Sequence, residues 1–374
     1  MAACTAKVTV AGPNAGLAAT AERNPEAVIV TQEYQVKSPS FKLNGVEITG
    51  AGNKDMLHAY VAGEIVLESC YFYDCNSLLR IKAAVAMDKI DVINCKFGKV
   101  TQFVLWTQQS GCSLAEFNMI GCLYDATNGS VGSGRIRLSN GSNSVWTIKD
   151  NYFDFGGQLA GAAMIANRTT SGVINVVGNT FKGDLVFILE NGDSAKGTVN
   201  FDGNLFLDKD GAVVTDVSSI VGNANLTVNM GKVAANDDER KEALKEPVYA
   251  TAAAVAEAFL ADYNTKNGKS LTAAELDSST SESSWLVAVM QDADLKAKWM
   301  WLYKALYTVG NGAEAANPEA EGQDFSAFEV KGFYLTNLCG FFTGTQHTDG
   351  AFGTSFDWTN SEAVATVMAA CPRA

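Results

Sequence analysis

Arginine and tryptophan residues recur at long intervals in the first half of the chain. Arg80, Arg137 and Arg168 lie 57 and 31 residues apart, and Trp106 lies between the first two. A guanidinium group can bind a carboxylate through two hydrogen bonds, and an aromatic face can stack on a flat or cationic group. If the chain returns to one face at these intervals, the four residues would line a carbohydrate-binding groove. The same pattern is also typical of a solvated polar face.

Catalysis on a polysaccharide would need more groups. A lyase would need clustered carboxylates for Ca²⁺ and a basic residue at the sugar carbon that loses its proton, whereas a glycoside hydrolase would need converging carboxylates. The basic candidates are Arg80, Arg135, Arg137, Arg168 and Lys182, and the acidic candidates are Asp150, Asp154, Asp202, Asp208 and Asp210. No motif compels catalysis. We therefore expect no cofactor, with calcium as the exception if the protein is a lyase.

The sequence contains few residues that could form a zinc site, a catalytic triad or another metal site. With only His58 and His347, a histidine-based zinc site or a Ser-His-Asp triad is not expected. The cysteines outside the repeat described below do not have metal-ligand spacing, so no metal site is predicted. A disulfide between Cys339 and Cys371 is left open.

A ten-residue pattern that repeats along the chain must position the candidate residues. It reads SVWTIKDNYF at 144–153, GVINVVGNTF at 172–181 and GTVNFDGNLF at 197–206, each with Asn two residues before Phe. Three earlier copies have Cys at the Asn position. The six equivalent residues, 25 to 29 positions apart, are Cys70, Cys95, Cys122, Asn151, Asn179 and Asn204.

Each copy predicts short strands and no helix. Apolar and polar residues alternate with a period of two, and a second apolar stretch follows after Gly, Asn and Asp turn residues. Strands without a crossover helix stack best as coils of a parallel β-solenoid, in which equivalent residues lie about 4.8 Å apart. The six residues would then form a ladder. Its Asn amides can bond the next coil and the backbone, and its Cys thiols can fill the same place as small buried groups.

This repeat resembles the right-handed parallel β-helix of the pectin-lyase-like superfamily. More narrowly, it is similar to β-helix domains of secreted or outer-membrane-anchored Bacteroidetes proteins, which are often associated with polysaccharide use. Residues Pro25 to Gly52 are similar to the strands that open such domains, and DGAFGTSFDWTN at 349–360 is similar to an ending found in proteins of these bacteria. The resemblance covers roughly residues 25–232. It implies a solenoid of about six or seven coils, but this fold hosts lyases, hydrolases, adhesins and tailspikes.

Charge and hydropathy limit the partners. The formal net charge of -13 argues against nucleic acid and against anionic membranes. It also disfavours a strongly anionic glycan, unless calcium or a local Arg cluster intervenes. No apolar run of about 18 residues is present, so no membrane insertion is expected. The opening MAACTAKVTV has no segment of signal length, which leaves a virion component as an alternative to a secreted protein.

The pattern changes after about Val233. Apolar residues at helical spacing predict a helix over 248–264 and one or two helices over 284–309. The second stretch carries an aromatic stripe, Trp299, Leu302, Tyr303, Leu306 and Tyr307, which suits a packed core or a sugar-stacking platform. The aromatic run FEVKGFYLTNLCGFF at 328–342 predicts a final pair of strands. We therefore divide the chain into a β-helix with an N-terminal cap, 1–234, and a mixed helical module, 235–374, for capping or assembly.

The expected function is binding or display. We expect a mainly β, non-catalytic protein at the cell surface or outside the cell that binds a polysaccharide through Arg80, Trp106, Arg137 and Arg168. One alternative is a polysaccharide lyase or glycoside hydrolase of the same fold. Another is a structural protein of a virion, with a homo-oligomer or larger assembly formed through 235–374.

Overall fold

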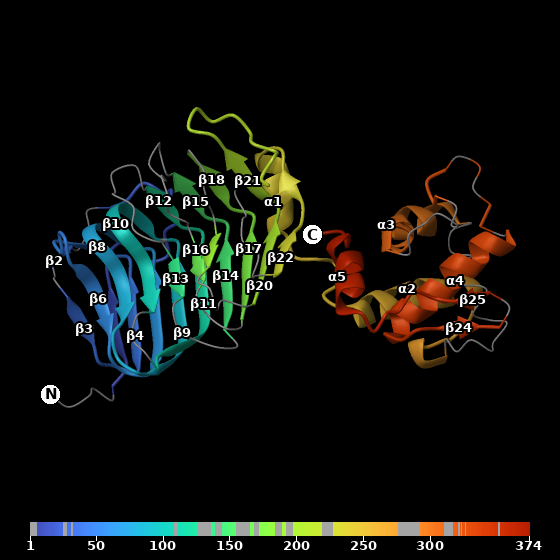
Figure 1. Cartoon of the computed structure of the whole chain (residues 1–374), viewed down its shortest axis with the longest axis horizontal. Helices are drawn as coiled ribbons and strands as arrows, with labels where there is room; N and C mark the ends of the chain where they lie inside the picture. Colours follow the sequence, from blue (N-terminus) through green and yellow to red (C-terminus); the bar gives the residue numbers. More distant parts are fainter. Residues whose placement is uncertain are drawn as a thin grey trace. The chain divides into compact units, whose positions relative to one another are not determined.

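The chain folds into two compact units, residues 1–244 and 245–374 (Figure 1). The structure is a computed structural model. The residues that it describes are 6–24, 28–30, 33–107, 111–125, 136–138, 144–154, 165–167, 172–183, 189–191, 197–218, 227–275, 292–309, 317–320, 322, 324–325, 327–350 and 352–374.

The first unit is a parallel β-solenoid, as predicted from the repeat. One sheet runs in the order β1 (Val8–Ala11), β4 (Ser40–Asn44), β7 (Gly63–Glu68), β9 (Ala86–Ile93), β11 (Ser113–Ile120), β14 (Val145–Lys149), β17 (Val173–Val177), β20 (Thr198–Asp202) and β22 (Thr227–Met230). Each strand pairs in parallel with the equivalent strand of the next coil, for example β14 with β17. This stacking confirms the mainly β fold class.

The other side of each coil belongs to a second sheet of 14 strands. Its strands are β2 (Val28–Val30), β3 (Tyr34–Val36), β5 (Glu47–Thr49), β6 (Asp55–Ala59), β8 (Tyr71–Ile81), β10 (Lys96–Thr107), β12 (Leu123–Asp125), β13 (Ile136–Leu138), β15 (Tyr152–Asp154), β16 (Ile165–Asn167), β18 (Thr180–Lys182), β19 (Leu189–Asn191), β21 (Asn204–Leu207) and β23 (Val233–Ala234). Among the described residues after β21, the short strands β22 and β23 add to the stack.

A turn with one left-handed residue joins the two sheets in each coil. The residues with positive φ at this point, between 52° and 68°, are Gly45, Ser69, Asn94, Gly121, Asp150, Gly178 and Gly203. Each donates its backbone N–H to the carbonyl oxygen before the equivalent turn of the next coil, as Asp150 does to Val177 at 3.1 Å. Gly, Asn and Asp tolerate this conformation best, which explains most of the residue types at these positions. The residue that follows each turn enters the core.

From Cys70 onward these following residues form the predicted ladder, and in the later coils it is a chain of amides. The Nδ2 atom of Asn151 donates to Oδ1 of Asn179, and Nδ2 of Asn179 donates to Oδ1 of Asn204, both at 2.9 Å. Each Oδ1 also accepts a backbone N–H from the coil before it, such as that of Asn151 at 3.0 Å. All three side chains are buried. The amides are thus satisfied only when the coils stack in this register.

The cysteines of the earlier coils occupy the same place with a weaker donor. The thiol of Cys122 donates to the carbonyl oxygen of Val92 at 3.3 Å, and that of Cys95 donates to Leu67 at 3.4 Å. In the later coils, Nδ2 of Asn179 donates to the equivalent carbonyl, that of Ile148, at 2.8 Å. The cysteines therefore do more than fill space, because each satisfies the carbonyl that an amide satisfies elsewhere. Burial, together with the hydrogen bond to Cys122, raises the pKa of Cys95 well above its usual value.

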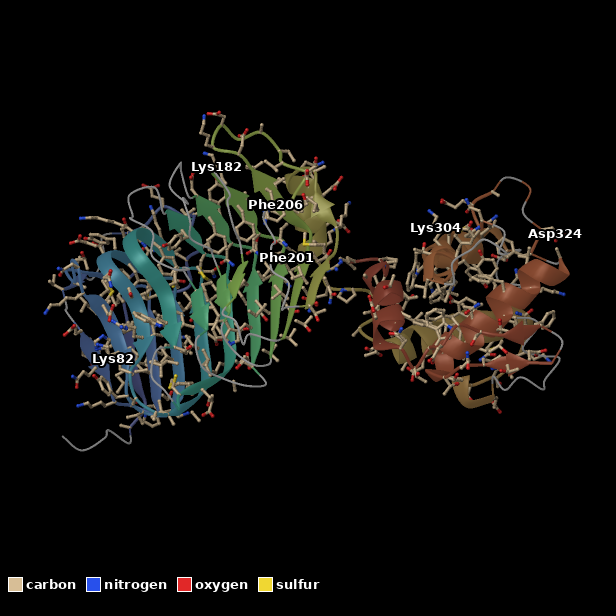
Figure 2. The ribbon with its side chains drawn as sticks, viewed as in Figure 1. Lys82, Lys182, Phe201, Phe206, Lys304 and Asp324 are labelled. Atoms are coloured by element: carbon tan, nitrogen blue, oxygen red, sulfur yellow. The ribbon has the colours of Figure 1, made fainter. Side chains whose placement is uncertain are left out.

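An aromatic stack fills the core beside the ladder. The side chains two residues after the ladder positions are fully buried, and neighbouring ring centroids lie 5.1 to 6.1 Å apart. Offset rings at this spacing attract each other beyond their burial. Figure 2 labels Phe206, the last ring of the stack. The six residues are Phe72, Phe97, Tyr124, Phe153, Phe181 and Phe206.

Helix α1 (Asp237–Leu244) packs against the last coils, so the first unit extends ten residues beyond the boundary expected at 234. The guanidinium of Arg240 contacts Asp150 and the carbonyl oxygen of Gly178, both at 2.7 Å. A side chain at Gly203 would collide with Ala243, at 2.0 Å. This charged helix therefore covers turns of the solenoid.

The second unit is helical around an aromatic core. Its elements are α2 (Ala252–Asn267), η1 (Ala273–Glu275), α3 (Ala293–Val309), α4 (Phe328–Thr343), the hairpin β24 (Thr348–Asp349) and β25 (Gly353–Thr354), and α5 (Ser361–Ala369). The predicted helices at 248–264 and 284–309 correspond to α2 and α3, although 276–291 lies outside the described residues. Of the aromatic stripe, Trp299, Leu302, Tyr303 and Leu306 are buried. This burial favours packing over a sugar platform.

The prediction of strands at 328–342 is wrong, because this segment forms α4. Aromatic residues favour strands when they lie on a half-buried surface. Here the segment is buried on nearly all sides, with Tyr334, Leu335 and Leu338 at 0 or 1% exposure. Its sequence therefore lacks the regularly spaced polar residues that would have indicated a helix. Gly344 ends the helix in the left-handed conformation, φ 65°. The thiols of Cys339 and Cys371 are both free.

We predict that Asn179→Ala lowers the free energy of unfolding of the solenoid by about 2–4 kcal/mol, since it leaves buried donors and a carbonyl of two neighbouring coils without partners. Urea unfolding followed by the β-sheet circular dichroism of the full chain measures this change. Asn200→Ala is the matched control: Asn200 bonds Asn175 at 2.8 Å on the half-buried outer face, and its loss should cost about 1 kcal/mol or less. Equal losses in the two variants would contradict the ladder's role.

Candidate functional site

The strand register brings three of the four predicted site residues to equivalent positions. Arg80 of β8 pairs with Trp106 of β10, and Trp106 pairs with Arg137 of β13. The side chain of Arg137 and the whole of Arg168 lie outside the described residues. The residue that pairs with Arg137 in the next strand, β16, is Ala166. We call Arg80, Trp106 and Arg137 the Arg-Trp row.

Two members of the row form a stacked pair. The guanidinium carbon of Arg80 lies 3.9 Å from the centroid of the Trp106 ring. Leu79 and Ile81 on either side of Arg80 are buried in the core, whereas Arg80 and Trp106 are half-buried. The row therefore lies on the outer face of the sheet. A guanidinium over an indole is a favourable cation–π contact, and it is stronger where water is partly excluded.

A buried carboxylate holds the guanidinium of Arg80 from behind. The Oδ2 atom of Asp55, at the start of β6, forms an ion pair with Nη1 of Arg80, and the Asp55 side chain is 3% exposed. The other oxygen, Oδ1, accepts a long hydrogen bond from Asn76 at 3.4 Å. Removing either partner of such a pair would leave a buried charge uncompensated. Arg80 is thus fixed in place before any ligand arrives.

His58 is a further member of this cluster, although the sequence predicted no functional site around it. It pairs with Arg80 in the register of β6 and β8, and its Nε2 atom lies 3.1 Å from Oδ2 of Asp55. The spacing concealed it, because His58 precedes Arg80 by 22 residues, fewer than the repeat length found downstream. Only a search that allowed a shorter first coil would have aligned the two residues.

The local backbone explains how Asp55 and His58 reach each other. The two residues between them, Met56 and Leu57, are both buried, at 0 and 1% exposure. Side chains of a regular strand alternate between faces, so two consecutive core residues mark a break in the alternation. The same double burial recurs in the next coil at Leu78 and Leu79. The side chains of Asp55 and His58, on either side of the break, can therefore lie on the same side of the strand, beneath Arg80.

The charges of the cluster follow from burial and pairing. Burial alone would raise the pKa of Asp55, but hydrogen bonds and the charge of Arg80, with contributions from His58 and Ser77, hold this pKa below its ordinary value. Burial lowers the pKa of His58, and the hydrogen bond to Asp55 opposes this shift only in part. At neutral pH the carboxylate is therefore ionised and the imidazole is neutral. The Nε2 atom of His58 must therefore carry the proton of its hydrogen bond to Asp55.

The acidic candidates for catalysis each have a separate partner. Asp150 pairs with Arg240 at 2.7 Å, and Asp154 pairs with the predicted base Lys182 at 3.3 Å. Asp208 accepts backbone N–H groups of its own turn, Asp202 accepts that of Lys232, and Asp210 pairs with Lys209. Arg135 lies outside the described residues. Within the described part of the chain, no three His, Cys, Asp or Glu residues are grouped closely enough to hold a metal ion.

A hollow of about 510 Å³ lies over the turns of the middle coils. Its lining includes Asn94, Gly121 and Ala19 and three charged residues, Asp150, Asp237 and Arg240. The guanidinium of Arg240 already forms ion pairs with both carboxylates. The hollow lies at the turns, whereas the Arg-Trp row lies on the strands of the second sheet.

Comparisons with known proteins found no relative: no family model, no curated protein and no solved structure matches the chain. In the described parts of the chain, the helices are too short or too polar to cross a lipid bilayer.

The lowered pKa of His58 predicts a pH-dependent component of stability. Because the folded-state pKa lies below the unfolded value of about 6.5, this component is fully present above that pH and is lost as pH falls below it. We therefore expect the solenoid of the wild-type chain to lose stability to urea on going from neutral pH to about pH 5, and His58→Gln to lose less.

Measurements at about pH 5 and above keep Asp55 ionised in both proteins, so the difference between the two slopes reports on His58. If the slopes of the wild type and of His58→Gln were equal, the buried neutral histidine would be refuted.

Proposed function

We propose that the protein is a non-catalytic β-helix protein, at the cell surface or outside the cell, that binds a polysaccharide along the Arg-Trp row. The observation that carries the proposal is the stacked pair of Arg80 and Trp106, 3.9 Å apart, with Asp55 buried behind it. This arrangement offers a flat, partly exposed surface whose side chains are already ordered. A ligand that stacks there does not need to immobilise them, which lowers the cost of binding.

The solenoid suits a linear ligand because its outer face repeats. Equivalent positions of successive coils, such as Arg80, Trp106 and Arg137, follow one another in register at about 4.8 Å. Solenoid proteins use such extended surfaces for binding. The resemblance of the repeat to pectin-lyase-like and Bacteroidetes surface β-helices supports a polysaccharide as the linear ligand.

Charge limits the kind of polysaccharide. The positive charge of Arg80 is compensated by Asp55, so Arg137 is the cation of the row that could bind a sugar carboxylate. The net charge of the chain, -13, opposes a dense polyanion. We therefore propose an uncharged or sparsely charged glycan.

Binding is a better match to the described residues than catalysis. A hydrolase or lyase of this fold needs carboxylates that converge on one sugar. Asp150, Asp154 and Asp202 instead have their own separate partners. A lyase remains the enzyme alternative, and it would reveal itself by an unsaturated product.

A glycan array probed with the full chain tests the proposal. We expect binding to a neutral or weakly acidic polysaccharide, and we expect Trp106→Ala and Arg137→Ala each to weaken it at least about tenfold, because each removes one contact of a small interface. Lys99→Ala is the control: Lys99 is an exposed cation on the same strand, paired with Asp74, and its loss should leave binding unchanged.

Two results would contradict the proposal. The first is glycan binding that Trp106→Ala and Lys99→Ala affect equally. The second is the release of an unsaturated product, with or without calcium, that Arg137→Ala abolishes, since this would make the protein a lyase.

A further inference from the structure

The N-terminal end of the solenoid leaves three strands without an outer neighbour. β1 pairs only with β4, β2 only with β5 and β3 only with β6 among the strands of the described residues. The register shows which peptide groups are open. The N–H of Gly12 and the carbonyl oxygen of Val36 form hydrogen bonds with the next coil. The peptide groups of successive residues in a strand point alternately to its two sides, so those of Thr9 and Gln35 point toward the free edge.

Between these strands the core itself is open. Val10 and Tyr34 continue the inward-facing rows of Leu43 and Leu57, yet they are 36% and 48% exposed. They line an apolar hollow of about 120 Å³ together with Ile29 and Phe41. In the coils behind them, the residues of the same rows are almost completely buried. The exposed end therefore has the composition of a core and not of a surface.

We propose that this end is an interface between two copies of the chain, joined head to head about a two-fold axis. A molecule that binds this end must pair with the free strand edges of both sheets and must place apolar side chains in the hollow between them. A single extended segment could pair with only one of the three edges, whereas a second solenoid end matches all of them. A second copy presents the same three strands and the same hollow, as an isologous contact requires.

The other end of the solenoid is less suited to such a contact. Helix α1 packs there on β21 and β23, and the chain continues from Leu244 directly into the second folded unit. A head-to-tail contact would also propagate into an open fibre, whereas the head-to-head contact closes after two copies. Pairing the free edges in a closed dimer removes the hazard of uncontrolled strand addition.

Sedimentation velocity of the full chain over a concentration series tests this interface. We expect a dimer, and we expect Tyr34→Lys to weaken it at least about 100-fold, because it places a charge in the apolar hollow. Gln35→Pro should weaken it at least about tenfold by removing a donor at the free edge, a place where a single solenoid tolerates proline. Val145→Lys is the control, since Val145 is 47% exposed on β14, away from this end, and should leave the dimer unchanged.

Circular dichroism and the urea midpoint of each variant show whether it is folded, and Gln35→Pro keeps the test valid if Tyr34→Lys does not fold. A monomer at all concentrations would overturn the proposal. So would a dimer that both variants leave intact, because it would then form through another surface, such as residues 245–374. Glycan binding by the Arg-Trp row does not enter this experiment.

Discussion

The structure depends on one constraint, which is that the buried Cys or Asn side chain just after each inter-sheet turn, from Cys95 to Asn204, must find hydrogen-bond partners in neighbouring coils. The amides of Asn151, Asn179 and Asn204 bond one another and the backbone of neighbouring coils. Slipping one coil by a single residue would bury these groups without partners and would also turn the apolar side chains outward. The ladder therefore sets the register, and the register in turn aligns the aromatic stack and the outer face.

The candidate site is a consequence of this register. Arg80 and Trp106 can stack because β8 and β10 place them opposite each other, and Asp55 can reach Arg80 because the alternation of β6 breaks at Met56 and Leu57. The buried charge of Asp55 is tolerated because Arg80 compensates it, and neutral His58 donates its Nε2 proton to the same carboxylate. The ordered outer surface and the charged cluster behind it are thus one arrangement.

The sequence revealed the parts of the fold that repeat. The spacing of Cys and Asn residues predicted the ladder. The same periodicity predicted an aligned row of Arg80, Trp106, Arg137 and Arg168, of which the strand register pairs the first three. The role of His58 was not predicted because its coil is shorter than the repeat found downstream. The role of Asp55 was not predicted because a single acidic residue in a strand forms no recognisable pattern with its distant partner Arg80. The strands predicted at 328–342 failed for a different reason. Burial on nearly all sides removes the polar periodicity that distinguishes a helix from a strand. The aromatic composition alone then favoured strands where the chain forms α4.

Hydrogen exchange of the native full chain, resolved to single residues, tests the central claim most directly. The backbone N–H groups of Cys122, Asn151 and Asn179 donate to the amide oxygen of the next coil, at 2.8 to 3.0 Å. If the ladder sets the register, these turn amides exchange as slowly as the strand amides of β14 and β17, through global unfolding of the solenoid. Exchange as fast as in an unstructured peptide would contradict the account.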